Sequence, residues 1–121
     1  MVLNNRDRLH RELAINPSEI VMANPYFQRK TNTTPGCQID YLVQTKFNTL
    51  YVCEIKSVKH PLGPDIIQEM TQRCERLKVP KNFTVRPVLL HMNGITESVR
   101  EQEYFSHLID IKDFLHEDRA Q

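Results

Sequence analysis

Apolar and polar residues alternate most clearly over two neighbouring runs, 37–46 and 49–58, which are rich in β-branched and aromatic side chains. Successive side chains of a strand point to opposite faces, so this alternation predicts two β-strands. Only Phe47 and Asn48 separate the runs, and such a short connection is typical of a β-hairpin. The two runs are therefore expected to pair as antiparallel strands.

A helix and an edge strand are predicted before the hairpin. Leu9 and Leu13 are four residues apart among charged side chains, which predicts an amphipathic helix over 4–15. Residues 19–30 have the composition of a strand that contains Pro25. Because proline cannot donate a hydrogen bond to a neighbouring strand, this strand is expected at the edge of a sheet.

After the hairpin, apolar residues recur at spacings of three and four over 65–78, which predicts a helix with Asp65 as its N-cap. A strand over 84–94, a short helix that begins at Thr96 and a strand over 107–111 are expected to follow, before a polar tail. The predicted buried stripe of the longer helix consists of Ile67, Met70, Cys74 and Leu77.

The composition is that of one ordinary globular domain. The chain has 121 residues, of which 40% are hydrophobic and 26% charged, and such a length corresponds to one compact unit over 1–121. No apolar run approaches the ~20 residues that cross a bilayer, and no leader pattern opens the chain. The three cysteines form no Cys-x-x-Cys pair, which favours reduced thiols. We therefore expect a cytoplasmic protein with no membrane contact.

The charge of the chain limits the partners that composition alone can indicate. The formal net charge is +1 and the sequence pI is about 7.8. No basic field of the kind that by itself indicates nucleic-acid binding is therefore expected over the whole surface. Any nucleic-acid binding would depend on a local site.

Glu54 and Lys56 interrupt a strand that otherwise reads as buried, and they mark a candidate for such a site. Because they are two positions apart on a strand, both side chains point to the same face. One interpretation is a solvated face with a surface ion pair, which would contribute at most about 1 kcal/mol. The other is a functional site. The residue opposite Glu54 in the hairpin decides between them.

The turn of the hairpin determines that residue. A three-residue turn over 46–48, with Asn48 in the left-handed conformation, places Asp40 directly opposite Glu54. A two-residue turn would put the two acids on opposite faces. Opposed like charges destabilise a sheet, and Mg²⁺, which takes carboxylate, water and phosphate oxygens as ligands, would neutralise them. The three-residue turn therefore predicts a cation site with Lys56 beside it.

These residues resemble the PD-(D/E)xK nuclease superfamily. Asp40 is followed after thirteen residues by Glu54-Ile55-Lys56 on a strand, and then by a helix and another strand. Ile39 stands where the superfamily usually has proline. Three segments are more closely similar to the nuclease-like domain at the carboxy end of bacterial AAA-type ATPases: NPYFQRKT, GCQIDYLVQTKFNTLYVCEIK and RPVLLHMNGITESV. The resemblance covers nearly the whole chain and leaves open whether it is a fragment or a stand-alone version of such a domain.

The resemblance implies a restriction-endonuclease-like α/β fold, in which helices flank the mixed central sheet of an αβββαβ core. It implies that Asp40 and Glu54 bind Mg²⁺ or Mn²⁺ together with the backbone carbonyl of Ile55. Lys56 would orient or activate water and offset charge on the phosphorane. The implied function is metal-dependent hydrolysis of nucleic acid, with DNA as the expected substrate. The alternative is a non-cleaving module of the same fold that binds DNA or serves as a scaffold for an ATPase domain or partner.

Several further residues are secondary candidates under this resemblance. Many members of the superfamily add an acid from the first helix, for which Glu12 and Asp7 are available. Gln68, with Glu69 as a second choice, could reach the site from the next helix, although Asp65 and Gln68 also have the spacing of a capping box. The candidate phosphate-binding residues are Arg29, Lys30, Lys59 and His60, with Arg73 and Arg76 in the helix, although isolated basic residues usually belong to a solvated face.

Overall fold

The structure is a computed structural model that describes residues 5–112 and 114. The predicted polar tail lies largely outside the described residues. Within the described part, no helix is both long and apolar enough to cross a bilayer. The helices are α1 (Arg6–Glu12), the short 3-10 helix η2 (Pro17–Glu19), α2 (Asp65–Arg76) and α3 (Glu97–Gln102). The strands are β1 (Ile20–Gln28), β2 (Cys37–Thr45), β3 (Thr49–Lys56), β4 (Thr84–His91) and β5 (His107–Asp110).

The five strands form one mixed sheet in the order β1-β2-β3-β4-β5. The first three strands are antiparallel neighbours, whereas β4 runs parallel to β3 and β5 runs parallel to β4. β1 lies at an edge of the sheet, as the proline at position 25 predicts. The α/β class and the mixed sheet expected from the sequence are confirmed.

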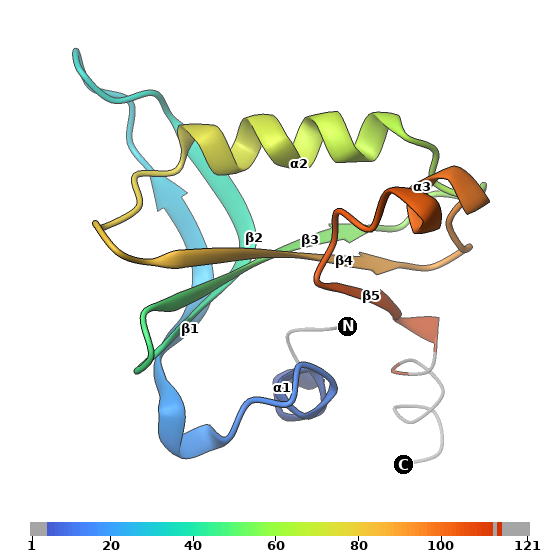
Figure 1. Ribbon diagram of the computed structural model, residues 1–121, viewed down its shortest axis with the longest axis horizontal. Helices are drawn as coiled ribbons and strands as arrows, with labels where there is room; N and C mark the ends of the chain where they lie inside the picture. Colours follow the sequence, from blue (N-terminus) through green and yellow to red (C-terminus); the bar gives the residue numbers. More distant parts are fainter. Residues whose placement is uncertain (1–4, 113, 115–121) are drawn as a thin grey trace.

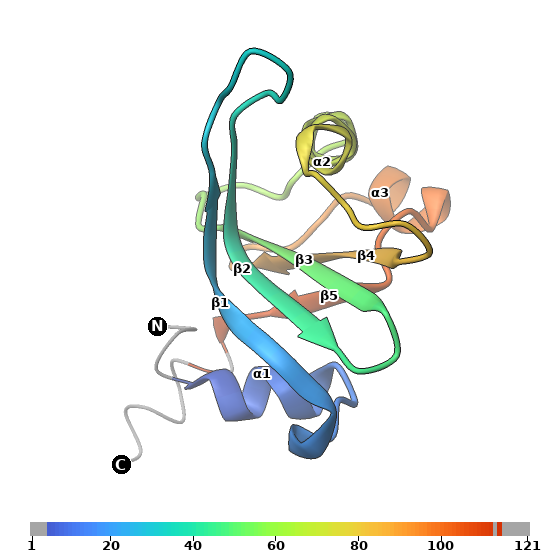
Figure 2. The same cartoon turned by 90° about the vertical axis from the view of Figure 1, so that its left-hand side faces the viewer.

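Helices cover both faces of the sheet (Figure 1). On one face, Leu9 and Leu13 from the first helical segment pack in a core that includes Cys53 of β3. On the other face, Met70 of α2 packs in a second core that includes Val52. Figure 2 shows α1 below the sheet and α2 and α3 above it. β3 is therefore buried on both faces, which explains its nearly continuous apolar run.

The β2–β3 hairpin has the predicted register. Residues 46–48 form a three-residue turn, and Thr45 pairs with Thr49. Asn48 has a φ of 55°, the left-handed conformation that the turn requires. The alternative two-residue turn is therefore wrong. Continued by one step beyond the last paired residues, the same register brings Asp40 to Glu54.

A β-bulge interrupts β2 next to this point. Asn24 pairs with Leu42, but Tyr26 pairs with Ile39, so β2 has one more residue than β1 across the interval. An extra residue of this kind bends its strand and redirects side chains. Beyond the bulge, the β1–β2 hairpin extends past the rest of the sheet and runs beside α2 (Figure 2).

The helix starts differ from the prediction in one respect. Pro64, rather than Asp65, occupies the N-cap position of α2, and no side chain caps this helix. The capping box of Asp65 and Gln68 is therefore not formed. Pro64 has a φ of −60°, so its ring already fixes the chain in a helical conformation. Thr96 is the N-cap residue of α3, as expected, and Glu103 in the left-handed conformation ends that helix.

The buried stripe of α2 is turned relative to the predicted one. Ile66, Met70 and Leu77 are buried, whereas Ile67 is only partly buried. These three buried positions and Arg73 follow one another at spacings of four, three and four, so they share one face of the helix. The rotation places an arginine on the side of α2 that faces the sheet.

Candidate functional site

Asp40 lies where β2 and β3 separate. The backbone pairing of these strands ends one residue before it, at Tyr41 and Cys53. Oδ2 of Asp40 accepts a hydrogen bond from the backbone N–H of Ile55 at 2.8 Å. The side chain thereby continues the connection to β3 after the backbone ladder has ended. A carboxylate can accept about four hydrogen bonds or ligands, so this bond orients Asp40 and leaves further acceptor capacity.

Glu54 is a buried acid with two cationic neighbours. The residue is 6% exposed, and its Oε2 accepts a hydrogen bond from Nη1 of Arg73. Its Oε1 lies 3.8 Å from Nζ of Lys56. The interpretation of Glu54 and Lys56 as a solvated surface ion pair is therefore wrong, because the acid is removed from water.

The surroundings of Glu54 alter its protonation. Burial raises the pKa of the Glu54 carboxyl above its ordinary value of 4.5, and the negative charge of Asp40 raises it further. The nearby charges of Arg73 and Lys56 act in the opposite direction. The charge of Asp40 on the adjoining strand therefore acts on Glu54, as expected for a neighbouring carboxylate.

Lys56 has a second acidic partner, from α2. Its Nζ lies 3.1 Å from Oε2 of Glu69. Gln68, the preferred candidate from the sequence, is exposed and lines neither cleft described below. Of the two α2 candidates predicted from the sequence, Glu69 is therefore the one that reaches the predicted site. Side chains at adjacent helix positions point about 100° apart. Because α2 is rotated relative to the prediction, Glu69 rather than Gln68 faces the site.

Two clefts flank Glu69. The hairpin cleft, of about 350 Å³, is lined by Phe27 and residues 36–38 of the β1–β2 hairpin and by Glu69, Gln72, Arg73 and Arg76 of α2. The loop cleft, of about 250 Å³, is lined by residues that include Lys56, His60, Leu62, Asp65 and Glu69. The charged cluster of Glu54 and Lys56 therefore lies between two openings to solvent.

The other candidates from the sequence lie at various distances from this cluster. Glu12 is exposed on α1, on the opposite side of the sheet, where its Oε1 is 4.0 Å from Nε of Arg8. His60 lines the loop cleft, and its Nδ1 lies 3.0 Å from the Pro61 carbonyl oxygen. Arg29, Lys30 and Lys59 are exposed, the first two directly after β1. Glu12 is thus separated from the site, and His60 adjoins it.

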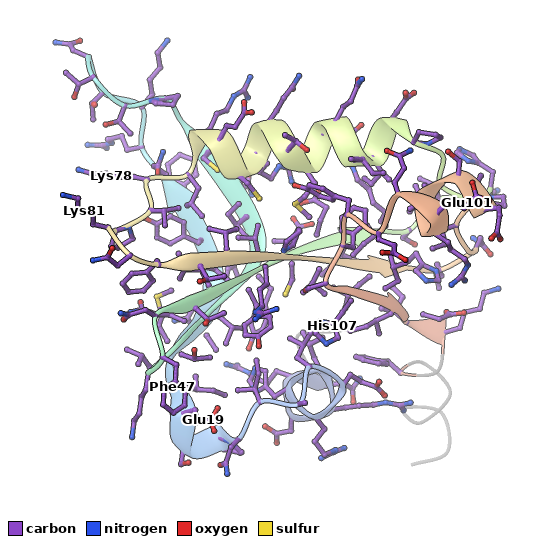
Figure 3. The ribbon with its side chains drawn as sticks, viewed as in Figure 1. Glu19, Phe47, Lys78, Lys81, Glu101 and His107 are labelled. Atoms are coloured by element: carbon purple, nitrogen blue, oxygen red, sulfur yellow. The ribbon has the colours of Figure 1, made fainter. Side chains whose placement is uncertain are left out.

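Gln28 joins the wall of the hairpin cleft to α2. Its side-chain Nε2 donates to the carbonyl oxygens of Pro35 at 2.8 Å and Arg76 at 2.6 Å. Its Oε1 accepts from the backbone N–H of Lys78 at 2.7 Å, and Figure 3 labels Lys78 just beyond the end of the helix. One buried amide therefore ties the hairpin to the carboxy end of α2.

Sequence reasoning did not identify the contacts of two of these residues. Gln28 has no local motif, because its partners are backbone groups from distant segments. The contact of Arg73 with Glu54 could have been suspected from an arginine that follows Ile66 and Met70 at stripe spacing. A charged residue on such a stripe is unusual unless it is paired.

The donor atoms fit a hard divalent cation. Among the described residues, no group of three or more histidine, cysteine, aspartate and glutamate side chains is arranged to hold a metal ion. Mg²⁺, however, commonly takes only one or two protein carboxylates and completes its shell with water and substrate phosphate. Asp40 and Glu54 would supply two such carboxylates, and the charge of Glu54 is in part offset by Arg73 and Lys56.

Comparison with known proteins identifies the fold. No protein-family model and no curated protein sequence matches the chain. A solved structure, a repair endonuclease from Pyrococcus abyssi, is similar with a TM-score of 0.53 and 15% sequence identity. The similarity covers 91% of this chain and 46% of the endonuclease chain, so this chain spans less than half the length of that protein. The chain has a restriction-endonuclease-like nuclease fold.

Proposed function

We propose that this domain hydrolyses phosphodiester bonds of nucleic acid in a reaction that depends on Mg²⁺ or Mn²⁺, with DNA as the expected substrate. The observation that carries the proposal is the buried Glu54 beside Asp40, in contact with Lys56, which lines the loop cleft, and with Arg73, which lines the hairpin cleft. A buried acid whose pKa is raised by burial and by a second acid nearby is a common feature of catalytic sites. The nuclease fold supports the same conclusion.

Each residue of the site has a role that follows from its surroundings. Asp40, Glu54 and the Ile55 carbonyl would hold the cation, and the Ile55 N–H keeps Asp40 oriented. When bound, the cation withdraws charge from the scissile phosphate and lowers the pKa of bound water. Lys56 holds a positive charge where negative charge develops in the transition state. Glu69 positions its ammonium group.

A second function is favoured by one specific observation. Arg73 bonds to Glu54, and Glu69 pairs with Lys56, so these four side chains carry two negative and two positive charges. A balanced cluster of this kind needs no cation to be stable. The alternative is therefore a non-cleaving module of the nuclease fold that binds DNA or serves as a scaffold for an ATPase domain or partner.

Nicking of supercoiled plasmid separates these functions. We expect the wild-type protein to nick only with Mg²⁺ or Mn²⁺, and Asp40→Asn to lose both activity and Mg²⁺ binding by calorimetry. Asp110→Asn is the matched control, because Asp110 is exposed on β5 and has no assigned role in the site, and it should retain both. A wild-type protein that binds single- or double-stranded DNA or RNA but cleaves none of them would establish the module instead. Full activity of Asp40→Asn would show that the site is wrongly assigned.

A further inference from the structure

Phe27 is an exposed aromatic residue in a cleft beside the proposed catalytic site. Among the described residues, three large apolar side chains are exposed: Val21, Phe27 and Phe47. Phe27 is 72% exposed and is the one of these three that lines the hairpin cleft. An apolar ring presented to solvent in a cleft is a surface on which a flat ligand can stack.

The rest of the cleft presents polar groups suited to a nucleotide. Arg76 is exposed, and within the described part of the chain no ion pair engages its guanidinium. Gln38 and Gln72 add side-chain amides, which can donate to and accept from base edges. A guanidinium is well matched to phosphate oxygens. The volume of about 350 Å³ lies in the range of small-ligand sites, about 300–1,000 Å³.

The cleft adjoins the proposed catalytic site through two of its lining residues. Arg73 lines the cleft and bonds to Glu54. Glu69 lines the same cleft and lies 3.1 Å from Lys56, so its negative charge is offset. A strand whose phosphate lies at the catalytic site would therefore place a neighbouring nucleotide in the cleft. In a duplex each base is stacked and paired, so only an unpaired base can offer its face to Phe27.

We propose that the hairpin cleft binds an unpaired nucleotide of the substrate strand, with its base stacked on Phe27 and an adjacent phosphate on Arg76. The site would thus prefer single-stranded to duplex nucleic acid. This inference rests on the proposed function for its substrate class, but its binding step is tested without cleavage.

The chain contains no tryptophan, which allows a direct test of stacking. Phe27→Trp introduces one indole in the cleft, and Phe47→Trp introduces one at the β2–β3 turn. Both positions are 72% exposed, and Figure 3 shows Phe47 on the opposite side of the sheet from α2. Titration with an oligo-dT strand in metal-free buffer should quench the fluorescence of Phe27→Trp and leave Phe47→Trp unchanged. Binding by fluorescence anisotropy with equal or no quenching in both variants would overturn the proposal.

Affinity gives a second readout that separates this inference from the catalytic one. Phe27→Ala should weaken binding of oligo-dT by about tenfold, the scale of one lost base stack, whereas Phe47→Ala and duplex binding should be unchanged. A parallel titration with oligo-U shows whether the affinity differs between RNA and DNA. Quenching without any nuclease activity would support the cleft and overturn the proposed function. Active protein in which Phe27→Ala binds and cleaves single strands normally would overturn the cleft alone. A change in oligomeric state in place of the binding defect would likewise overturn it.

Discussion

The two faces of the sheet bury polar groups in opposite ways. On the α1 face, Nε2 of His10 lies 2.9 Å from the hydroxyl of Tyr41, and the two rings are stacked. Burial lowers the pKa of His10 and raises that of Tyr41, so both remain uncharged near neutral pH. On the α2 face, Glu54 is equally buried but lies among charged partners.

This difference separates a structural contact from one that we propose to be functional. A neutral pair satisfies its hydrogen bond at little electrostatic cost, whereas an ion removed from water costs several kcal/mol unless it is paired. Packing alone does not require an acid at position 54, because an apolar residue would fill the same space. The energetic cost of burying this charge is understandable if the charge takes part in binding or catalysis beside the clefts. We therefore expect substitutions on the α2 face to change activity and those on the α1 face to change stability.

The largest expected effect is on catalysis. Lys56→Ala should lower the rate of plasmid cleavage by about a hundredfold or more, because it removes a positive charge that is fixed where the transition state needs it. Affinity for Mg²⁺ and DNA should change little. Lys46→Ala, an exposed lysine at the hairpin turn, is the matched control. Cleavage by Lys56→Ala at the wild-type rate would contradict the expectation that substitutions on the α2 face change activity.

A smaller effect is expected on the α1 face. Tyr41→Phe removes the hydroxyl and leaves Nε2 of buried His10 without this partner. The free energy of unfolding should fall by about 1–2 kcal/mol, the usual loss when a buried polar group is left unpaired, as measured by urea denaturation. Cleavage at saturating Mg²⁺ should be unchanged. Tyr51→Phe, in which a partly buried tyrosine of β3 is changed, serves as the control. A loss of activity without a loss of stability would contradict our assignment of the faces.

The smallest effect is a difference in pH dependence, measured by urea unfolding of the protein with EDTA. The pKa of Glu54 is raised in the folded state, so stability should fall as pH rises from 4.5 through that raised pKa, because the folded state then holds more protons than the unfolded state. The pKa of His10 is lowered, so its contribution is complete above pH 6.5 and is lost as pH falls through the lowered pKa.

Two variants isolate the opposite effects of Glu54 and His10 on the pH dependence of stability. Glu54→Gln should remove the loss of stability on raising the pH, and His10→Gln should remove the loss on lowering it. Gln68→Ala, a substitution of an exposed uncharged residue of α2, should leave the wild-type profile unchanged. Identical pH profiles for Glu54→Gln and the wild-type protein would show that the buried acid does not titrate differently in the folded state.

The hairpin could be predicted from the sequence because its determinants are local. Alternation identifies both strands, and one asparagine with a positive φ fixes the turn length. The turn length in turn fixes which residue meets Glu54, since register propagates along paired strands. The bulge in β2 could not be predicted, because it depends on the pairing of β2 with β1.

The helix side of the site could be predicted only in part. Periodicity finds an apolar stripe on α2, but it fixes the rotation of the helix only to within about one residue, or 100°. In the packing of α2 against the sheet, Ile66 is buried and Ile67 only partly buried. That rotation brought Arg73 to Glu54 and Glu69 to Lys56. Gln68, one position away, was left exposed.

The hydrogen bonds of the Gln28 side-chain amide divide the β1–β2 hairpin into two parts that differ in how well they should tolerate changes of sequence. Below Gln28, the wall of the cleft is tied to the end of α2. Above it, the tip closes on itself, because Thr31 and Thr34 share a backbone hydrogen bond of 2.8 Å and the Thr31 hydroxyl accepts from the N–H of Thr34 at 3.0 Å. Inserted or exchanged residues at such an exposed tip are usually tolerated. We therefore expect that residues can be inserted at the tip without a change in the width of the hairpin cleft.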